Sequence, residues 1–591
     1  MNSGGNGRNA SRGHGPGADR GQGQNQGQSR GQSRGQGQKQ GQGQKQGLGQ
    51  AQGRGGSGGK GGGRGARPPK PVRDEARNTA YDLMRAVDER DAYANLLMPA
   101  LLRERRLSGR DAGLATELAY GTLRGLGTYD EIIAACSDRA PEKVDPPLLD
   151  AVRLGVHQLL RTRIPPHAAV GTTVDLVRLR VGIGASKYAN AVLRKVSTRS
   201  LEQWIPIVAP DPADDPVGHL AVAHSHPRWI VDALRDAVGG DFDETAALLA
   251  ADNERPRVTL VARPGRSSTA ELLDAGAEPA RYSRYAAYLP EGDPGAILAV
   301  AESRAAVQDE ASQLVALALT RVPVRGADSR WLDLCAGPGG KAGLLDAIAA
   351  DGDEAGLPAP ALGVNGDGTG QDGAHRDGTN GDGTGKDGTA QDGAHQDGAG
   401  RDGIGGNGAG RDGAGDVRPG DGPVAFGGGA HLLAAELQYH RARLVRQTTR
   451  RAAVITADGT EPAWRPGVFD RVMLDAPCTG LGALRRRPEA RWRRDPRSLP
   501  ELSALQRGLL TSALEAVRPG GVVAYVTCSP HLAETVAVVD DVLRHRDDVE
   551  TLDARAYLPE IADGLGEGPY ARFWPHRHGT DAMFLALLRR H

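Results

Sequence analysis

The apolar positions of residues 71–200 recur every three or four residues, which is the spacing of one face of a helix. Segments such as AGLATELAYGTLRGLGTYDEIIAAC and PPLLDAVRLGVHQLLR carry this pattern, and two Pro-Pro pairs, at 146–147 and 165–166, separate the segments. Proline is tolerated in the first turn of a helix but interrupts one elsewhere. We therefore predict an all-α domain of about six helices over residues 71–200.

From residue 303 the pattern changes to short apolar runs that alternate with helical segments. The runs are WLDL, HLLAAE, AAVIT, VMLD and GGVVAYVT, and each is followed by a turn or a polar residue. Strands that alternate with helices are typical of a parallel, doubly wound α/β sheet. Residues 201–302 carry both kinds of pattern, so we predict a small α/β linker domain there and an α/β domain over 303–591.

Two segments carry neither pattern and are predicted to be disordered. Residues 1–70 are rich in Gly, Gln and Arg and have almost nothing apolar to bury. In residues 351–429, which interrupt the α/β domain, an Asp recurs at every fifth position from 367 to 402. A period of five fits neither a helix nor a strand, and the regular apolar position of a calcium-binding repeat is missing, so we expect no metal site.

Composition and charge narrow the function classes. The chain has 73 basic and 73 acidic residues, but residues 1–70 hold twelve bases and one acid, whereas residues 351–429 hold fourteen acids and five bases. The basic tail is either a solubilising segment or a weak, salt-sensitive RNA contact. Four widely spaced cysteines predict no disulfide framework and indicate a reducing cytoplasm. Since no apolar run approaches the ~20 residues of a membrane span, we expect no membrane partner.

A glycine-rich turn and a series of strand-end acids predict a nucleoside cofactor site. The turn, DLCAGPGGK, follows the first strand of the α/β domain and opens a helix, but its spacing is neither that of a phosphate-binding loop nor G-x-G-x-x-G. Glu436 follows Asp333 by 103 positions, of which the insert accounts for 79, leaving the 24 that a ribose-binding acid needs. Asp458 and Asp475 end the next two strands, at the edge where open α/β folds bind ligands.

At this point the sequence resembles the RsmB/Sun branch of the NOL1/NOP2/Sun RNA cytosine-5 methyltransferases. The motifs that carry the resemblance are DLCAGPGGK, DAPCTGLGALRRRPEARW, TCSPHLAET and VQDEASQL, with FWPHRHGTDAMFLALL near the end of the chain. The last motif departs from the family pattern, because Ala582 and Met583 stand where the family usually has Gly and Phe. YANAVLRKV and IPPHAAVGTTVDLV resemble the NusB-like RNA-binding domain of this branch. The resemblance covers residues 74–591 without the insert.

The resemblance implies a Rossmann-like, S-adenosylmethionine-dependent domain that methylates C5 of a cytosine in ribosomal RNA, in particular small-subunit 16S RNA. It implies that Cys528 is the nucleophile that adds to C6, that Cys478 assists elimination, and that Asp475 holds the cytosine edge. The implied contacts of the methionine part of the cofactor are Cys335, Ala336, Gly337, Pro338, Gly339, Gly340 and Lys341. Glu436 is implied to contact the ribose and Asp458 the adenine, with Asp475 bordering the cofactor as well. The Cys335 thiol is expected to do no chemistry.

A basic segment, LRRRPEARWRR, follows the Cys478 motif. One interpretation is a solvated loop. Because the segment follows a predicted cytosine site, we instead expect RNA phosphate contacts and a base stacked on tryptophan. The residues assigned to this role are Arg485, Arg486, Arg487, Arg491 and Trp492.

Three other functions are weighed against this one. A non-catalytic RNA-binding or assembly factor has no need of both Cys478 and Cys528, and a dinucleotide oxidoreductase is disfavoured by the glycine spacing. A cytosine-5 methyltransferase acting on another RNA, such as tRNA, stays open. We expect a monomeric cytoplasmic enzyme that needs S-adenosylmethionine and no metal, and that binds ribosomal RNA.

Overall fold

A computed structural model of the chain describes residues 74–351 and 430–591. The tail predicted over 1–70 lies outside the described residues. The insert predicted over 351–429 lies outside them too, apart from Asp351, which ends a helix. Within the described parts, no helix is long and apolar enough to cross a membrane. In the same parts, no cluster of three or more His, Cys, Asp or Glu side chains is arranged to hold a metal ion.

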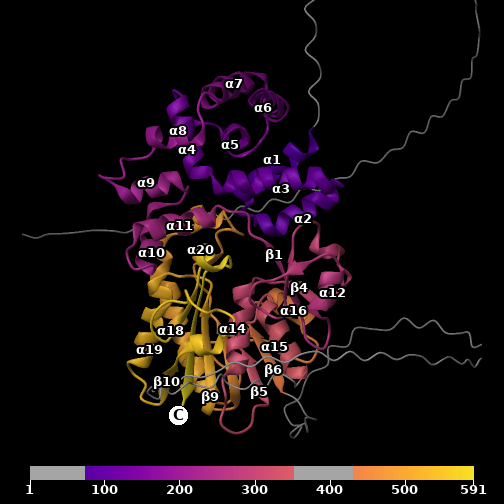
Figure 1. The fold of residues 1–591 in the computed structure, drawn as a ribbon, viewed down its shortest axis with the longest axis vertical. Helices are drawn as coiled ribbons and strands as arrows, with labels where there is room; N and C mark the ends of the chain where they lie inside the picture. The colour runs from indigo at the N-terminus through magenta and orange to yellow at the C-terminus, as the bar shows by residue number, and fades with distance from the viewer. Residues whose placement is uncertain (1–73, 352–429) are drawn as a thin grey trace, which may run out of the picture. The chain divides into compact units, whose positions relative to one another are not determined.

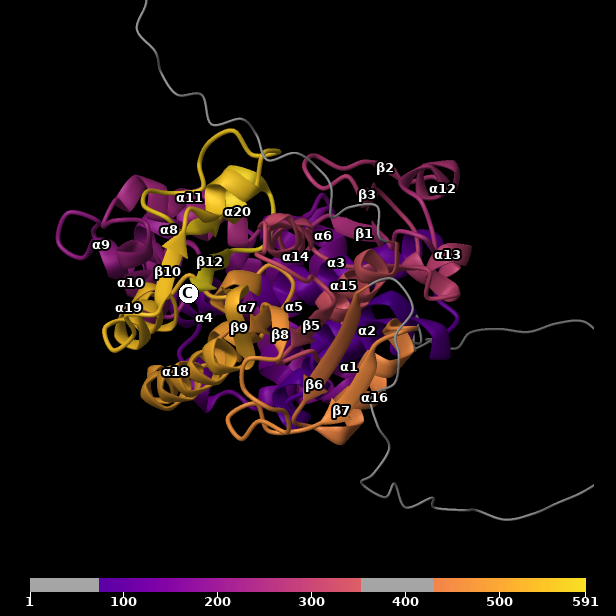
Figure 2. The ribbon, with the colours of Figure 1, turned by 90° about the horizontal axis from the view of Figure 1, so that it is seen from below.

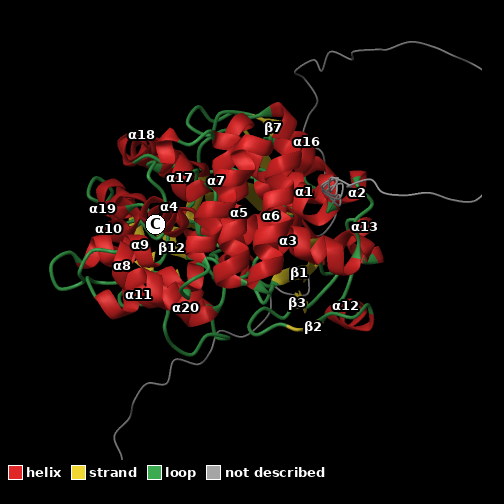
Figure 3. Ribbon diagram, turned by 90° about the horizontal axis from the view of Figure 1, so that it is seen from above, coloured by secondary structure: helices red, strands yellow, loops and turns green. Residues whose placement is uncertain are grey.

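Residues 74–198 form a helical domain with a single apolar core. Asp74 caps the first helix by accepting a hydrogen bond from the backbone of Arg77, and Pro146 and Pro166 begin two others, as the proline pairs predict. Gly125 divides the segment that the sequence pattern treats as one helix, which gives one helix more than expected. Figure 3 shows α5, α6 and α7 side by side. The helices are α1 (Glu75–Arg90), α2 (Ala94–Glu104), α3 (Gly109–Arg124), α4 (Leu126–Cys136), α5 (Pro146–Arg161), α6 (Pro166–Arg180) and α7 (Ile183–Val196), with a 3₁₀ turn, η1 (Pro141–Lys143).

The linker region contains both helices and strands, and its strands form a small antiparallel sheet in the order β2-β3-β1-β4. Its last strand, β4, lies beyond residue 302, so the sheet extends past the boundary drawn from the sequence. The helices are α8 (Leu201–Val208), α9 (Pro216–Ala223), α10 (Arg228–Ala237), α11 (Phe242–Asp252), α12 (Thr269–Asp274) and α13 (Leu298–Ala301), with η2 (Pro294–Ala296). The strands are β1 (Val258–Ala262), β2 (Glu278–Pro279), β3 (Ala286–Leu289) and β4 (Ala305–Val307).

The remaining residues form an α/β domain around an eight-stranded sheet in the order β10-β12-β9-β8-β5-β6-β7, with β11 paired to β12. Its strands are β5 (Arg330–Asp333), β6 (His431–Glu436), β7 (Ala453–Thr456), β8 (Phe469–Asp475), β9 (Val517–Thr527), β10 (Val549–Leu552), β11 (Ala571–Phe573) and β12 (Met583–Arg590). Its helices are α14 (Glu310–Arg321), α15 (Gly340–Asp351), α16 (Tyr439–Thr448), α17 (Ala490–Arg493), α18 (Leu499–Ala516), α19 (Val536–Leu543) and α20 (Pro575–His578). Four 3₁₀ turns complete it: η3 (Leu481–Ala483), η4 (Pro496–Ser498), η5 (Leu532–Glu534) and η6 (Ala554–Tyr557).

Both faces of this sheet are covered, which explains its continuous apolar strands. Along β9, Val523 and Tyr525 face the core shared with α18 and α19, whereas Val522, Ala524 and Val526 face the core shared with α14 and α15. Figure 1 shows α18 and α19 on one side of the sheet and α14 and α15 on the other. A strand that is buried on both faces reads as an apolar run rather than as an alternating one.

The five strands that the sequence predicts, β5 to β9, are parallel, as expected. The C-terminal strands differ, because β12 pairs antiparallel with β9 and with β10. The sheet is therefore mixed rather than wholly parallel. Figure 2 shows β9, β8, β5, β6 and β7 following one another across the sheet. Because these five strands run in one direction, their carboxyl ends meet at one edge, where the predicted site residues lie.

Candidate active site

The turn between β5 and α15 requires glycine at two positions, for two different reasons. A Cβ atom on Gly337 would lie 2.1 Å from Oε2 of Glu436, so only glycine fits against that carboxylate. Gly339 has a φ of +107°, and a Cβ atom there would lie 2.2 Å from Oγ1 of Thr448. The turn is thus built to lie close to the end of β6 and to α16.

Glu436, at the end of β6, is buried against this turn. One carboxylate oxygen accepts a hydrogen bond from the backbone of Gly337 at 3.0 Å, and the other accepts one from the backbone of Gln438 at 3.0 Å. Asp458, just after β7, is exposed, and its Oδ1 accepts from the backbone and the hydroxyl of Thr460 at 2.9 and 2.7 Å. These bonds lower the pKa of Asp458. The two acids lie on neighbouring strand ends.

Lys341 and Asp475 form an ion pair at the centre of the edge, with 2.8 Å between Nζ and Oδ2. Asp333 lies next to them. In the sequence it served only as the position from which the spacing to Glu436 was counted. It is buried at the end of β5, and its Oδ1 has no hydrogen-bond partner. Burial, with repulsion from Asp475, raises the pKa of Asp333 to about 8. A buried carboxyl with an open acceptor favours a cationic ligand group beside it.

Cys478 and Cys528 meet at this edge. Each follows the end of a strand, β8 for Cys478 and β9 for Cys528, and these strands are adjacent in the sheet. The two Sγ atoms are 3.4 Å apart, both thiols are free, and both side chains are half-buried. A hydrogen bond from the Cys478 thiol lowers the pKa of Cys528, and Lys341 adds to the effect. The same bond raises the pKa of Cys478. Of the two thiols, Cys528 is thus the one that ionises more readily.

Cys335 has a different environment, although it also follows a strand. Burial raises the pKa of its thiol, and the carboxylates of Asp333, Asp475 and Glu436 raise it further. A protonated thiol is a poor nucleophile, so the Cys335 side chain has none of the activation that Cys528 has.

Glu534 fixes the two cysteine-bearing loops to each other, and the sequence analysis did not identify it. It is fully buried, and it accepts hydrogen bonds from the backbone of Thr479 at 2.7 Å and from the Ser529 hydroxyl at 2.6 Å. The Thr479 hydroxyl and the Gln506 amide also donate to it. Thr479 follows Cys478, and Ser529 follows Cys528, so one carboxylate holds both loops in register. Glu534 lies in the TCSPHLAET motif, six positions after Cys528. A charged residue so close to a candidate catalytic cysteine was the feature of the sequence that could have indicated its role.

The basic segment predicted to bind RNA is largely a connection inside the protein. Arg491 is fully buried, and its guanidinium donates to the carbonyls of Arg124, Ser225 and Asp252 at 2.8–3.2 Å. Arg485 is buried as well, where its guanidinium donates to the carbonyl of Gly579 and its own carbonyl accepts from Arg124. Both side chains are buried and bonded to backbone carbonyls, with only their Nε atoms lacking a partner, so in this structure neither guanidinium is exposed to an approaching RNA.

The other three residues of that prediction lie nearer the surface. Arg486 is half-buried between the carboxylates of Asp309 and Asp581, at 2.7 and 2.9 Å. Arg487 is exposed, and Trp492 is 42% exposed. RNA contact thus stays a prediction for Arg487 and Trp492, whereas Arg486 is already neutralised by two acids.

Comparison with known proteins finds family models for two parts of the chain and relatives that match most of it. The family model described as 16S rRNA methyltransferase RsmB/F matches residues 427–589, and that of the NusB family matches residues 74–198. A protein named putative methyltransferase Rv1407, from Mycobacterium tuberculosis H37Rv, is 46% identical over 520 residues, which is 88% of this chain and 97% of that protein. The probable ribosomal RNA small subunit methyltransferase B of Bacillus subtilis is 24% identical, with 87% and 98% covered.

A solved structure, described as that of PH0851, shares the fold. Its TM-score is 0.61 at 19% identity, and the match covers 88% of this chain and 99% of that one. The Mycobacterium relative is similar enough over nearly the whole chain to establish the family. This protein therefore belongs to the RsmB/F family of S-adenosylmethionine-dependent ribosomal RNA methyltransferases, with a NusB-family domain preceding the catalytic one.

Proposed function

We propose that this protein methylates C5 of a cytosine in small-subunit ribosomal RNA, through a covalent bond between Cys528 and C6 of the base. The observation that supports this most directly is the thiol pair, with 3.4 Å between the sulfur atoms, beside the Lys341–Asp475 ion pair. A protein that only bound RNA would not need two free thiols held together at the carboxyl edge of the sheet. In this proposal Cys528 is the nucleophile and Cys478 assists elimination.

Addition begins the reaction, because C5 of cytosine is a poor nucleophile by itself. The Cys528 thiolate attacks C6, and the electrons of the C5–C6 double bond move toward C5 and the N3 edge. Asp475 holds that edge through the N3/N4 groups. The hydrogen bond from Cys478 and the charge of Lys341 favour the thiolate before the attack, since both lower the pKa of Cys528.

Elimination completes the reaction. Bound S-adenosylmethionine supplies the methyl group from its sulfonium, and C5 then carries both the methyl and a proton. When a base removes that proton, the C5–C6 double bond re-forms, the C6–S bond breaks, and the electron pair returns to Cys528. The Cys478 thiol, whose sulfur lies 3.4 Å from that of Cys528, would then donate a hydrogen bond that stabilises the departing thiolate.

The residues at the carboxyl edge fit the cofactor. We assign its methionine part to the turn from Cys335 to Lys341, its ribose to Glu436 and its adenine to Asp458. Asp333 is added to this set, because its unpartnered, buried oxygen suits the ammonium group of the methionine part. A cation there would favour the charged form of a carboxyl whose pKa burial has raised to about 8.

Mapping of methylated cytosines tests the proposal. 5-Methylcytosine should disappear from one position of small-subunit RNA in a strain that lacks the protein, and tRNA should be unaffected. Loss from tRNA instead would favour the alternative RNA substrate. The purified protein should bind S-adenosylmethionine and not NAD. We expect it to act as a cytoplasmic monomer.

Gly337→Ala should weaken S-adenosylmethionine binding at least about 10-fold, which corresponds to ~1.4 kcal/mol. The added Cβ would lie 2.1 Å from Oε2 of Glu436 and would displace the carboxylate that we assign to the ribose. Isothermal titration would measure the affinity. Gly508→Ala is the control, since its Cβ would meet only Thr460, at 3.6 Å. Wild-type affinity in Gly337→Ala would contradict the ribose assignment.

Glu534→Gln should slow methyl transfer about 10- to 100-fold without unfolding the protein, because an amide has one acceptor oxygen where the carboxylate has two. The loosened loops should weaken the hydrogen bond from Cys478 to Cys528. The pH midpoint for alkylation of Cys528 should therefore rise toward that of an ordinary thiol. A merely structural role for Glu534 would leave that midpoint unchanged. Glu501→Gln, at an exposed position of α18, is the matched control.

A further inference from the structure

The two cysteines at the carboxyl edge of the sheet are close enough to react with each other. The Sγ atoms of Cys478 and Cys528 are 3.4 Å apart, and both cysteines are free. This separation is already within the ~3–3.5 Å at which reacting atoms meet before a bond forms. Each side chain is only half-buried, so a small oxidant in solution can reach the pair.

The backbone around the pair is arranged so that a bond between the two sulfur atoms can close. Asp475 and Val526 are paired on adjacent strands, and the two cysteines follow them by three and two residues. The carbonyl of Cys528 accepts a hydrogen bond at 2.9 Å from the backbone of Gly482, four residues after Cys478. Neighbouring strands lie about 4.8 Å apart, within the ~4.4–6.8 Å of Cα separation that a disulfide spans. Shortening the sulfur–sulfur distance to about 2.05 Å therefore requires small side-chain rotations rather than a displaced backbone.

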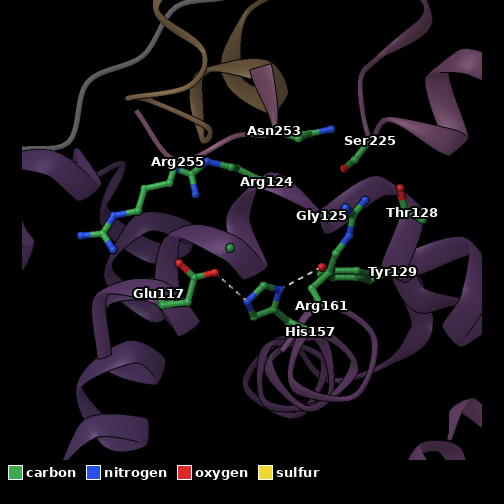
Figure 4. Close-up of a pocket in the computed structure, with 11 residues that line it drawn as sticks. Glu117, Arg124, Gly125, Thr128, Tyr129, His157, Arg161, Ser225, Asn253 and Arg255 are labelled. Carbon is green, nitrogen blue, oxygen red and sulfur yellow. Dashed lines mark hydrogen bonds and ion pairs between the residues drawn. The ribbon is translucent and has the colours of Figure 1, made fainter. Parts of the chain in front are cut away.

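The other two cysteines of the chain lie in environments that protect them from oxidation. Cys136 is 2% exposed in the core of the helical domain, and burial raises the pKa of its thiol. The cavity beside its helix, α4, is lined by Thr128 and Tyr129 of that helix and by none of the described cysteines (Figure 4). Burial also raises the pKa of Cys335. Because peroxides react with thiolates, the pair at the sheet edge is where an oxidant should act first.

We propose that Cys478 and Cys528 are a modification site at which hydrogen peroxide forms a reversible disulfide, and that this disulfide switches methyl transfer off. In the first step the Cys528 thiolate attacks one peroxide oxygen. The O–O bond breaks, hydroxide leaves, and the sulfur becomes a sulfenic acid. In the second step the Cys478 sulfur attacks the Cys528 sulfur, the S–S bond forms, the S–O bond breaks, and hydroxide leaves with the Cys478 proton as water. The two sulfur atoms supply the two electrons that reduce the peroxide.

Closing this bond removes the nucleophile, so the loss of activity rests on the proposed function. Glu436 and the glycine-rich turn lie outside the bond, and S-adenosylmethionine should still bind the oxidised protein. A small thiol reverses the modification by attacking one sulfur, and a second thiol then releases the mixed disulfide, which restores both cysteines. The pair also protects Cys528, because a sulfenic acid captured as a disulfide does not proceed to sulfinic acid, which thiols do not reduce.

The test uses the reduced full chain, treated with a small excess of hydrogen peroxide and then with an alkylating reagent. Free thiols should fall from four to two, and the intact mass should be lower by two hydrogen atoms. A cross-linked peptide should contain both Cys478 and Cys528. Methyl transfer should fall at least about 10-fold, since the nucleophile is blocked. Dithiothreitol should restore both the thiols and the activity.

Two variants separate the steps of the modification. In Cys478→Ala the same treatment should leave a sulfinic acid at Cys528, which adds two oxygen atoms to the mass and which dithiothreitol does not reverse. Cys335→Ala is the matched control. It should form the same disulfide as the wild type at the same dose of peroxide, because Cys335 lies outside the pair.

Three results would overturn the inference. One is four free thiols in the treated wild type, or a disulfide that includes Cys136 or Cys335. Another is a sulfinic acid at Cys528 in the wild type at the dose that produces it in Cys478→Ala, because Cys478 would then not capture the first product. The third is full methyl transfer by the cross-linked protein. The thiol and mass measurements need no RNA, so if the disulfide formed but the reduced protein methylated no RNA, the proposed reaction would be wrong and the modification site right.

Discussion

Replacing Cys528 with alanine should reduce methyl transfer to background, a fall of at least about 10⁴-fold, as for other covalent nucleophiles. The reason is that Cys528 is the member of the thiol pair whose pKa is lowered, which suits the role that we propose for it as the nucleophile that adds to C6. S-adenosylmethionine should still bind, since Glu436 and the glycine-rich turn are untouched. Transfer of labelled methyl groups to RNA and a titration with the cofactor measure the two quantities.

Cys335→Ala is the matched control for this loss, because Cys335 also follows a strand but its thiol stays protonated. It should be close to neutral. Methyl transfer by Cys528→Ala at a wild-type rate would mean that the covalent mechanism is wrong and that Cys528 is a packing residue.

Cys478→Ala should fail in the opposite way, by accumulating a covalent adduct with RNA. Without the thiol that stabilises the departing sulfur, C6–S cleavage slows, and multiple turnover should fall about 10²-fold or more. Denaturing electrophoresis should show a protein–RNA band that requires the cofactor and disappears in the Cys478→Ala/Cys528→Ala double variant. An adduct in Cys528→Ala and none in Cys478→Ala would reverse the two roles.

The pH dependence of the adduct gives a second measurement. The hydrogen bond from Cys478 is the largest cause of the lowered pKa of Cys528, so its loss should raise that pKa. In Cys478→Ala the rate of adduct formation should therefore reach its plateau at a higher pH than the rate of methylation in the wild type. A plateau at the same pH would show that Cys478 does not activate its neighbour.

The parts of this site that follow from strand periodicity could be read from the sequence. The strand ends at Glu436 and Asp475 were predicted, because apolar runs locate strands and parallel strands share an edge. Glu436 could be identified as the candidate ribose-binding acid only after the insert was subtracted from its distance to Asp333 in the sequence. The glycine-rich turn was identified too, as a place where a ligand can approach backbone amides, whereas its packing against Glu436 is seen only in the structure.

Contacts between segments distant in sequence could not be predicted in this way. Arg491 looked like an RNA contact because its neighbours are basic, yet its partners are carbonyls at 124, 225 and 252, and no local pattern indicates a carbonyl. Glu534 was missed for the same reason, since its importance comes from Thr479 on another loop. The antiparallel direction of β12 could not be predicted either, because an apolar run shows that a strand is buried but not whether it runs parallel or antiparallel to its neighbour β9.

The position of residues 352–429 in the chain has an evolutionary consequence. These residues connect the end of α15 to the start of β6, and His431 pairs with Arg330 at the start of β5. Both attachment points therefore lie at the amino-terminal edge of the sheet, opposite the cysteines. Relatives can gain, lose or diversify sequence at this junction by small genetic steps without passing through an inactive ancestor. Lineages of this family should thus differ far more in length here than in the loops after β5, β8 and β9.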